Sequence, residues 1–226
     1  MEMKKILDYL FALEAHNDPA FYHAHKPEYQ EACKIFEDFL SSLMDKLTLQ
    51  GDELPPVSPK ELTFKLNRDV RFSHDKSPYN PSFRAHIGPK GKLPIPVGYY
   101  IMIKPGGGSF IGGGLFAPMF KDATEMIRGY LCTHSDEWQQ IITSPDFTKY
   151  FTVMGEALKN VPRGYDPAHP QAEYLKNKSW YLEYHLSDEQ ILADDFLSFT
   201  AGLCAAMRPF NQFLNEALRD FVMPMR

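Results

Sequence analysis

The chain has 226 residues, of which 44% are hydrophobic and 23% are charged, and these values argue against a disordered chain because they are typical of globular proteins. Its formal net charge of −5 disfavours nucleic-acid binding, which calls for a basic face. The longest apolar stretch, 110–120, is rich in glycine and shorter than the roughly 20 residues that cross a membrane, so no membrane span is expected.

Helices are predicted for the first fifty residues. Apolar residues recur at helical spacing from Ile6 to Leu13, and this first helix should end near His16. Asp18 followed by Pro19 is typical of an N-cap and a first helical position. A longer helix with an apolar stripe is predicted over 27–49.

Strands are predicted for the middle of the chain. Apolar and polar residues alternate over 62–73, which indicates a strand, and Arg68 is the one charged residue on its apolar side. Arg68 would then need a buried partner, unless the chain turns at Arg68-Asp69. Three more strands are expected over 83–87, 97–103 and 109–115. Their short connections, rich in glycine and proline, favour an antiparallel meander.

Helices return in the second half of the chain, together with one clear strand over 180–186. We expect helices from Pro118 to about Cys132, over 136–143, from Pro145, from Ser187 or Asp188 to Met207, and, after a break at Pro209, over 210–221, with a short strand at 151–153. The order predicts a single α+β domain over 1–226, with a mostly antiparallel sheet (a central meander) flanked by N-terminal and C-terminal helices.

Neither a metal site nor a cofactor is expected. The three cysteines, Cys33, Cys132 and Cys204, are far apart, so they predict no disulfide framework and no zinc site, and they fit a reducing cytoplasm. The run 112–117 fits G-x-G-x-x-A, but the helix expected after it leads to more helix instead of a second parallel strand. A dinucleotide site needs that strand.

The polar segment 68–79 concentrates the chemistry of the chain, with three cations and two carboxylates among twelve residues. Arginine and lysine side chains bind phosphate or carboxylate groups. We therefore predict a cationic pocket for a small anionic ligand in a cytoplasmic protein. If the protein is an enzyme, His86 or His74 could act as its acid/base, although the sequence does not decide whether a reaction is catalysed. The candidate pocket residues are Arg68, Arg71, Lys76, Tyr79, Arg84 and His86.

Two alternatives remain open. In the first, the protein is a non-catalytic structural or interaction module, and the segment is a self-satisfied polar network that includes Asp69, Ser73 and Asp75. In the second, lysine side chains make a weak, salt-sensitive contact with nucleic acid. The lysines of this second alternative are Lys65, Lys76, Lys90 and Lys92. The oligomeric state does not follow from the sequence.

A family resemblance rests on the same segment. Residues 68–79 fit the run R-D-x-R-F-[ST]-x-D-K-[ST]-P-Y without a gap, and further similarity lies at 16–29, 98–100, 112–114 and 161–166. In these residues the chain resembles the uncharacterised microbial family known as domain of unknown function 2461. It departs from the family pattern at His16, where asparagine is usual, and at Ala20, near the usual Trp-Phe. The resemblance implies no activity, substrate or catalytic residue.

Overall fold

The computed structural model describes residues 2–116 and 120–224. In that part of the chain four strands form one antiparallel sheet in the order β1-β2-β3-β4, so each strand pairs with its neighbour in sequence. The strands are β1 (Phe83–Ile87), β2 (Tyr99–Ile103), β3 (Ser109–Leu115) and β4 (Trp180–Leu186). The predicted α+β class with an antiparallel meander between N- and C-terminal helices is confirmed.

Ten helices accompany the sheet in the described residues. They are α1 (Met3–Ala15), α2 (Pro19–Ala24), α3 (Lys26–Leu49), α4 (Pro59–Leu62), α5 (Lys121–Thr133), α6 (Ser135–Thr143), α7 (Pro145–Thr148), α8 (Ala172–Leu175), α9 (Asp188–Leu192) and α10 (Phe196–Ala217). The predicted cap of α2 is confirmed, since the Asp18 carboxylate accepts the Phe21 N–H at 2.9 Å. None of these helices is long and apolar enough to cross a bilayer.

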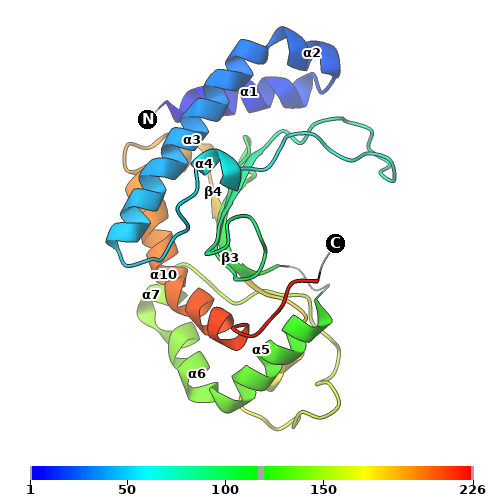
Figure 1. Ribbon diagram of the computed structural model, residues 1–226, viewed down its shortest axis with the longest axis vertical. Coiled ribbons are helices and arrows are strands. Elements are labelled where there is room, and N and C mark those ends of the chain that lie inside the picture. The colour runs from blue at the N-terminus through cyan, green and yellow to red at the C-terminus, as the bar shows by residue number, and fades with distance from the viewer. Residues whose placement is uncertain (1, 117–119, 225–226) are drawn as a thin grey trace.

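The long helices pack on one face of the sheet, which we call the covered face. In Figure 1, α3 and α10 run along one side of the strands, and α1 packs against α3. Helix α10 approaches β3 so closely that a Cβ atom at Gly113 would lie 2.7 Å from the sulfur of Met207. Burial of the alternate residues of each strand therefore depends on this helical layer.

The opposite face of the sheet, which we call the open face, carries the other residues of each strand. The strand register places them in rows across the sheet. One row is Arg84, Met102, Phe110 and His185, and the next is His86, Tyr100, Gly112 and Glu183. Phe110 and Tyr100 remain partly exposed, whereas Ile101 and Ile111 on the covered face are fully buried.

The strand predicted over 62–73 was wrong. Leu62 closes the short helix α4, and Thr63 makes only an isolated bridge to Ala85, next to a 2.9 Å hydrogen bond from the Phe64 N–H to the Arg84 carbonyl. Beyond Asn67 the chain leaves the sheet. Leu62 and Leu66 on the apolar side of the pattern are buried, but the alternation was misleading beyond them, because Phe72 on the same side is 94% exposed and has no core to face.

The helix break predicted at Pro209 was also wrong, because α10 runs through this proline to Ala217. Pro209 has no N–H, so the helix lacks one backbone hydrogen bond at this position. Burial of the Phe210 and Phe213 side chains, which follow it, offsets this loss. The break falls earlier: Ser187 caps the short helix α9, and the chain is irregular at 193–195 before α10. Residues 151–153 form no strand, and Pro118, expected to open a helix, lies outside the described residues.

A partly buried polar cluster fastens the segment after α3 to the covered face. The Asp52 carboxylate accepts the Tyr99 hydroxyl at 2.8 Å through one oxygen, and through the other it accepts the Arg208 guanidinium at 2.7 and 3.1 Å. Tyr99 is buried on β2, Arg208 belongs to α10, and the Asp52 side chain is only 12% exposed. One carboxylate thus joins three parts of the fold.

The Asp52→Ala substitution should lower the free energy of unfolding by about 1–3 kcal/mol, because it leaves a buried hydroxyl and a guanidinium without their acceptor. Urea unfolding measures the change. In the matched control Asp8→Ala, which removes the exposed Lys4–Asp8 pair on α1, the loss should stay below about 0.5 kcal/mol. Equal losses in the two variants would contradict a special role for Asp52.

Candidate ligand-binding site

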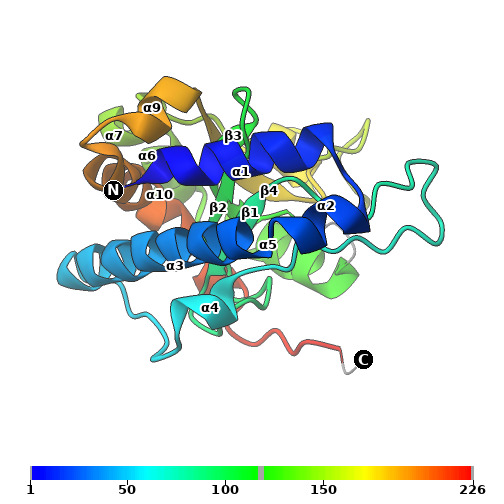
Figure 2. The same cartoon turned by 90° about the horizontal axis from the view of Figure 1, so that it is seen from above.

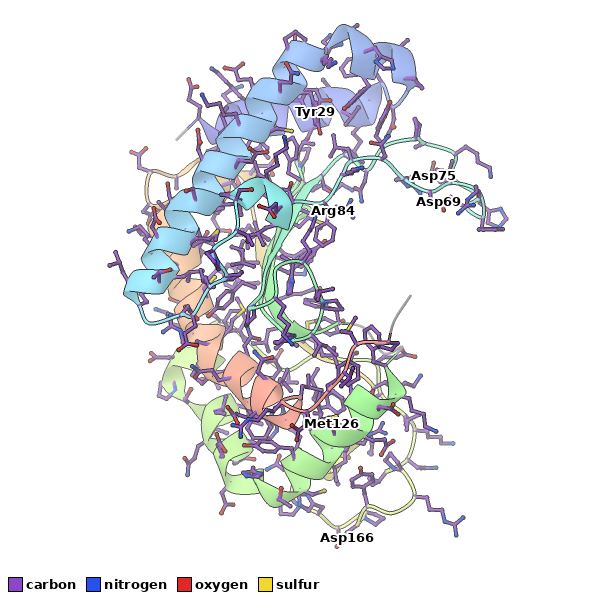
Figure 3. The ribbon with its side chains drawn as sticks, in the orientation of Figure 1. Tyr29, Asp69, Asp75, Arg84, Met126 and Asp166 are labelled. Atoms are coloured by element: carbon purple, nitrogen blue, oxygen red, sulfur yellow. The ribbon has the colours of Figure 1, made fainter. Side chains whose placement is uncertain are left out.

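The segment 68–79 forms a projecting arm. Its base is closed by a 2.9 Å hydrogen bond from the Arg68 N–H to the Pro78 carbonyl and by an isolated bridge between Asn67 and Tyr79. Figure 2 shows this stretch extending well beyond the helices and strands. Figure 3 places the labelled Asp69 and Asp75 near the far end of the arm. The arm is therefore exposed to solvent on most of its surface.

The charges of the arm pair with one another. Arg71 donates from Nε and Nη2 to Asp69 at 2.9 and 2.7 Å, and Arg68 forms an ion pair with Asp75. Hydrogen bonds from these arginines lower the pKa of both carboxyl groups. The Lys76 ammonium donates to the Val70 carbonyl at 3.0 Å. Most of the positive charge of the arm is thus already matched within it.

Ser73 and His74 add little to this network. Ser73 contributes a backbone N–H, which donates to the Val70 carbonyl at 3.3 Å. His74 is exposed on the arm.

Tyr79 anchors the arm to the N-terminal helices. Its N–H donates to the Asn17 side-chain oxygen at 3.1 Å, and its carbonyl accepts the Asn17 amide at 3.0 Å. The buried Tyr79 ring stacks on Tyr22 of α2 at 4.6 Å between centroids. Tyr79 and Arg68 also line a depression at the arm base, but there Arg68 pairs with Asp75, and Lys104 pairs with Glu14.

The six predicted pocket residues consequently do not line one cavity. Arg71 and Lys76 are exposed on the arm, whereas Arg84 and His86 lie on the open face of β1. Arg84 donates from Nη2 to the Lys65 carbonyl at 3.0 Å and lies 5.8 Å from the centre of the Phe64 ring. Figure 3 shows Arg84 close to the sheet and distant from the labelled carboxylates of the arm.

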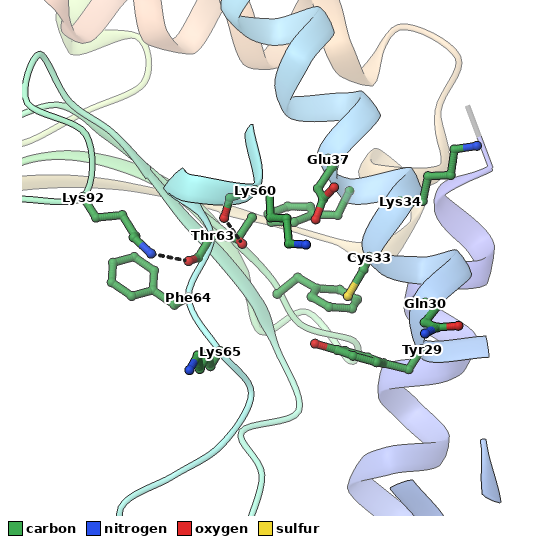
Figure 4. A pocket seen from close by; sticks show the side chains of 12 residues that line it. Tyr29, Gln30, Cys33, Lys34, Glu37, Lys60, Thr63, Phe64, Lys65 and Lys92 are labelled. Atoms are coloured by element: carbon green, nitrogen blue, oxygen red, sulfur yellow. Dashed lines mark hydrogen bonds between the residues drawn. The ribbon is translucent and has the colours of Figure 1, made fainter. Parts of the chain in front are cut away.

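The structure brings together a different set of cations. A hollow of about 540 Å³ lies between α3, the segment 60–65 and β1, and we call it the lysine hollow. Figure 4 shows Lys60 reaching toward α3 and the Tyr29 hydroxyl pointing into the same space. The lining residues are Tyr29, Gln30, Cys33, Lys34, Phe36, Glu37, Lys60, Thr63, Phe64, Lys65, Phe83 and Lys92.

Four lysines and one glutamate line this hollow, although the ammonium group of Lys34 points away from it in Figure 4. Lys92 donates to the Thr63 carbonyl at 3.0 Å. Within residues 2–116 and 120–224, Lys34, Lys60 and Lys65 form no ion pair. Unlike the arm, the lysine hollow therefore retains an excess of positive charge that an anion could neutralise.

The chemistry of the lysine hollow favours binding over nucleophilic attack. Burial raises the pKa of the Cys33 thiol, so it stays protonated near neutral pH. Burial also raises the pKa of the neighbouring Tyr29 hydroxyl. The floor is aromatic, because Phe83 stacks on Phe36 at 5.5 Å and on Tyr29 at 6.3 Å between centroids. Neither polar group is prepared as a nucleophile.

A second hollow, of about 340 Å³, lies on the open face, whereas the lysine hollow lies toward α3 and Phe83 of the covered face; we call the second one the aromatic hollow. Phe64 and Lys92 line both cavities and therefore separate them. The lining residues are Phe64, His86, Lys92, Pro94, Tyr100, Phe110, Gly114 and Phe116. The sequence analysis named His86 as a pocket residue and Lys92 as a nucleic-acid contact, but none of the rings, because the rings come from three separate parts of the chain.

His86 is held as a neutral acceptor at this site. Its Nδ1 lies 3.2 Å from the Gly91 carbonyl, and because a carbonyl only accepts, Nδ1 carries the proton. Burial lowers the pKa of the imidazole. In the neutral ring Nε2 is then unprotonated, and it has no hydrogen-bond partner among the residues that the structure describes.

The comparisons with known proteins give a family and no function. A family model described as "Conserved hypothetical protein (DUF2461)" matches residues 5–213. No curated protein and no solved structure gives a significant match. Within the described residues, no group of three or more His, Cys, Asp or Glu side chains is arranged to hold a metal ion.

The buried imidazole predicts a pH dependence of stability. Because the pKa of His86 is lower in the folded protein than in the unfolded chain, where it is about 6.5, the unfolded chain takes up the proton first. The contribution of His86 to stability should be fully present above that value and should decrease as the pH falls below it. Urea unfolding at pH 7.5 and 5.5 should show a larger loss for the wild type than for His86→Gln. Equal losses would contradict this assignment.

Proposed function

The chain belongs to this family of conserved hypothetical proteins, whose description names no activity, and we propose that the protein binds a small anionic ligand in the lysine hollow. The ligand carries a phosphate or carboxylate group. The observation that supports the proposal most is the charge balance of the cavity, where four lysines and one glutamate line a space of about 540 Å³. Pockets of roughly 300–1,000 Å³ are the usual size for small molecules.

The arrangement of the lysines supports an anion in the middle of the hollow. Lys60 comes from α4 and reaches toward α3 (Figure 4), and Lys65 comes from the segment beside β1, so an anion can lie between these lysines and the helix. Each ammonium offers three donors and a compact charge. The apolar floor formed by Phe36 and Phe83 reduces the access of water and strengthens these interactions relative to an exposed surface.

For the arm we retain the alternative of a self-satisfied polar network in a structural or interaction module. Pairing of Arg71 with Asp69 and of Arg68 with Asp75 supports it. A nucleic-acid contact receives less support, because Lys76 belongs to the projecting arm, while Lys65 and Lys92 line the lysine hollow. The net charge of −5 also opposes it.

We further propose that the protein works in a reducing compartment such as the cytoplasm. Cys33, Cys132 and Cys204 are all free thiols. Burial raises the pKa of each of them, so the unreactive thiol form prevails. The fold therefore uses no disulfide among them, as expected for an intracellular chain.

Removal of either of two unpaired lysines should weaken anion binding. We expect Lys60→Ala and Lys65→Ala each to raise the dissociation constant for inorganic phosphate by about tenfold, since a charge-assisted hydrogen bond contributes about 1.5 kcal/mol or more. Titration followed by calorimetry or by ³¹P NMR gives the constants. Thermal unfolding should show little change in stability, because neither lysine holds a carboxylate.

The matched control is Lys76→Ala, which removes the same charge from the arm and should leave the phosphate affinity unchanged. If Lys76→Ala weakens binding and Lys60→Ala does not, the site lies on the arm and the proposal fails. If the wild type retains neither phosphate nor a carboxylate such as citrate, the proposed function itself fails.

A further inference from the structure

The lysine hollow and the aromatic hollow meet at Phe64 and Lys92, which line both of them. Lys92 Nζ lies 5.9 Å from the centre of the Phe64 ring, and Arg84 lies 5.8 Å from it. On one side of this divider the walls are cationic, and on the other side they are mainly rings. A ligand that lies beside Phe64 therefore meets two kinds of surface.

The aromatic hollow is lined by rings that already pack against one another. Tyr100 lies 5.6 Å from Phe110 and 5.9 Å from Phe116 between centroids, and Phe116 stacks on Tyr181 at 4.7 Å. Gly112 permits this packing, since a Cβ atom there would lie 3.1 Å from Phe116 Cζ and 3.4 Å from Phe110 Cε2. The three lining rings remain partly exposed.

Gly114 leaves the floor of the aromatic hollow as bare backbone. Its φ of +92° suits glycine, and an added Cβ atom would lie 2.4 Å from the Trp180 carbonyl oxygen. A space bounded by rings and by a glycine backbone fits a flat conjugated group, because ring faces and edges attract one another beyond simple burial.

We propose that the anionic ligand also carries a flat conjugated ring, which lies in the aromatic hollow while its anionic group lies among the lysines. This inference rests on the proposed function. The volume of about 340 Å³ suits one small ring system and not a protein segment. His86 adds a polar determinant, because its unprotonated Nε2 can accept an N–H or O–H donor of the ring. The substrate class is thus a ring-bearing phosphate or carboxylate.

The test compares anions that differ only in the attached group. The probes are 1-naphthyl phosphate, phenyl phosphate, cyclohexyl phosphate and inorganic phosphate, titrated into the full chain at one ionic strength. We expect phenyl phosphate to bind about three- to tenfold more tightly than cyclohexyl phosphate, which has similar bulk but no π system, and 1-naphthyl phosphate to bind at least as tightly as phenyl phosphate.

Two variants test whether the gain arises in the aromatic hollow. Phe110→Leu and Tyr100→Leu each remove a ring from the open face while retaining an apolar side chain. Each should reduce the affinity for aryl phosphates to that for cyclohexyl phosphate and leave inorganic phosphate unchanged. Phe72→Leu is the control, because Phe72 is a 94% exposed ring on the arm. Thermal unfolding confirms that the variants fold.

The outcomes separate the two proposals. If all the phosphates bind with equal affinity, or if the advantage of the aryl phosphates persists in both hollow variants, the ring inference is overturned while the lysine hollow stands. If no probe binds, the proposed function fails and the ring inference fails with it. Loss of the aryl advantage in Phe110→Leu and Tyr100→Leu, but not in Phe72→Leu, supports the inference.

Discussion

The helical layer on one face of the sheet is the constraint on which the rest of this structure depends. Helices α3 and α10 bury the alternate residues of the meander, and the approach of α10 to Gly113 shows how tightly the two layers pack (Figure 1). Because strand residues alternate between faces, every residue committed to the core places its neighbour on the open face. The position of Ile101 in the core thus fixes Tyr100 outside it.

The two faces of the sheet consequently serve different purposes. The covered face is apolar and continuous with the N- and C-terminal helices. The open face contributes rings and the neutral His86 to the aromatic hollow, and the neighbouring segment 60–65 adds lysines beside it. Phe64 belongs to both cavities and is the point where a cationic wall gives way to an aromatic one. This contrast supports a ligand with two chemically distinct ends.

The arm shows why a dense cluster of charges is a weak guide to a pocket. Asp69 and Arg71 are two residues apart, and Arg68 and Asp75 are seven apart, so short loops let them neutralise one another. The lysines of the lysine hollow come from three parts of the chain, α3, the segment 60–65 and Lys92. Lys34, Lys60 and Lys65 form no ion pair among the described residues, although Glu37 and Glu61 lie close to Lys34 and Lys60 in sequence. Excess charge persists where the fold, and not the local sequence, brings cations together.

The sequence by itself determined the helices up to Leu49, the three strands of the meander, the strand over 180–186 and the α+β class, because these follow from local periodicity, caps and turns. It did not determine the path of residues 62–73, since alternation indicates a strand only where a core covers one side. Pro209 remained inside α10 for a related reason: buried rings on the next turn outweigh one lost hydrogen bond. Only the tertiary structure placed Lys34, Lys60 and Lys92 around one cavity, because contacts between residues so far apart in the chain depend on how α3 packs beside β1.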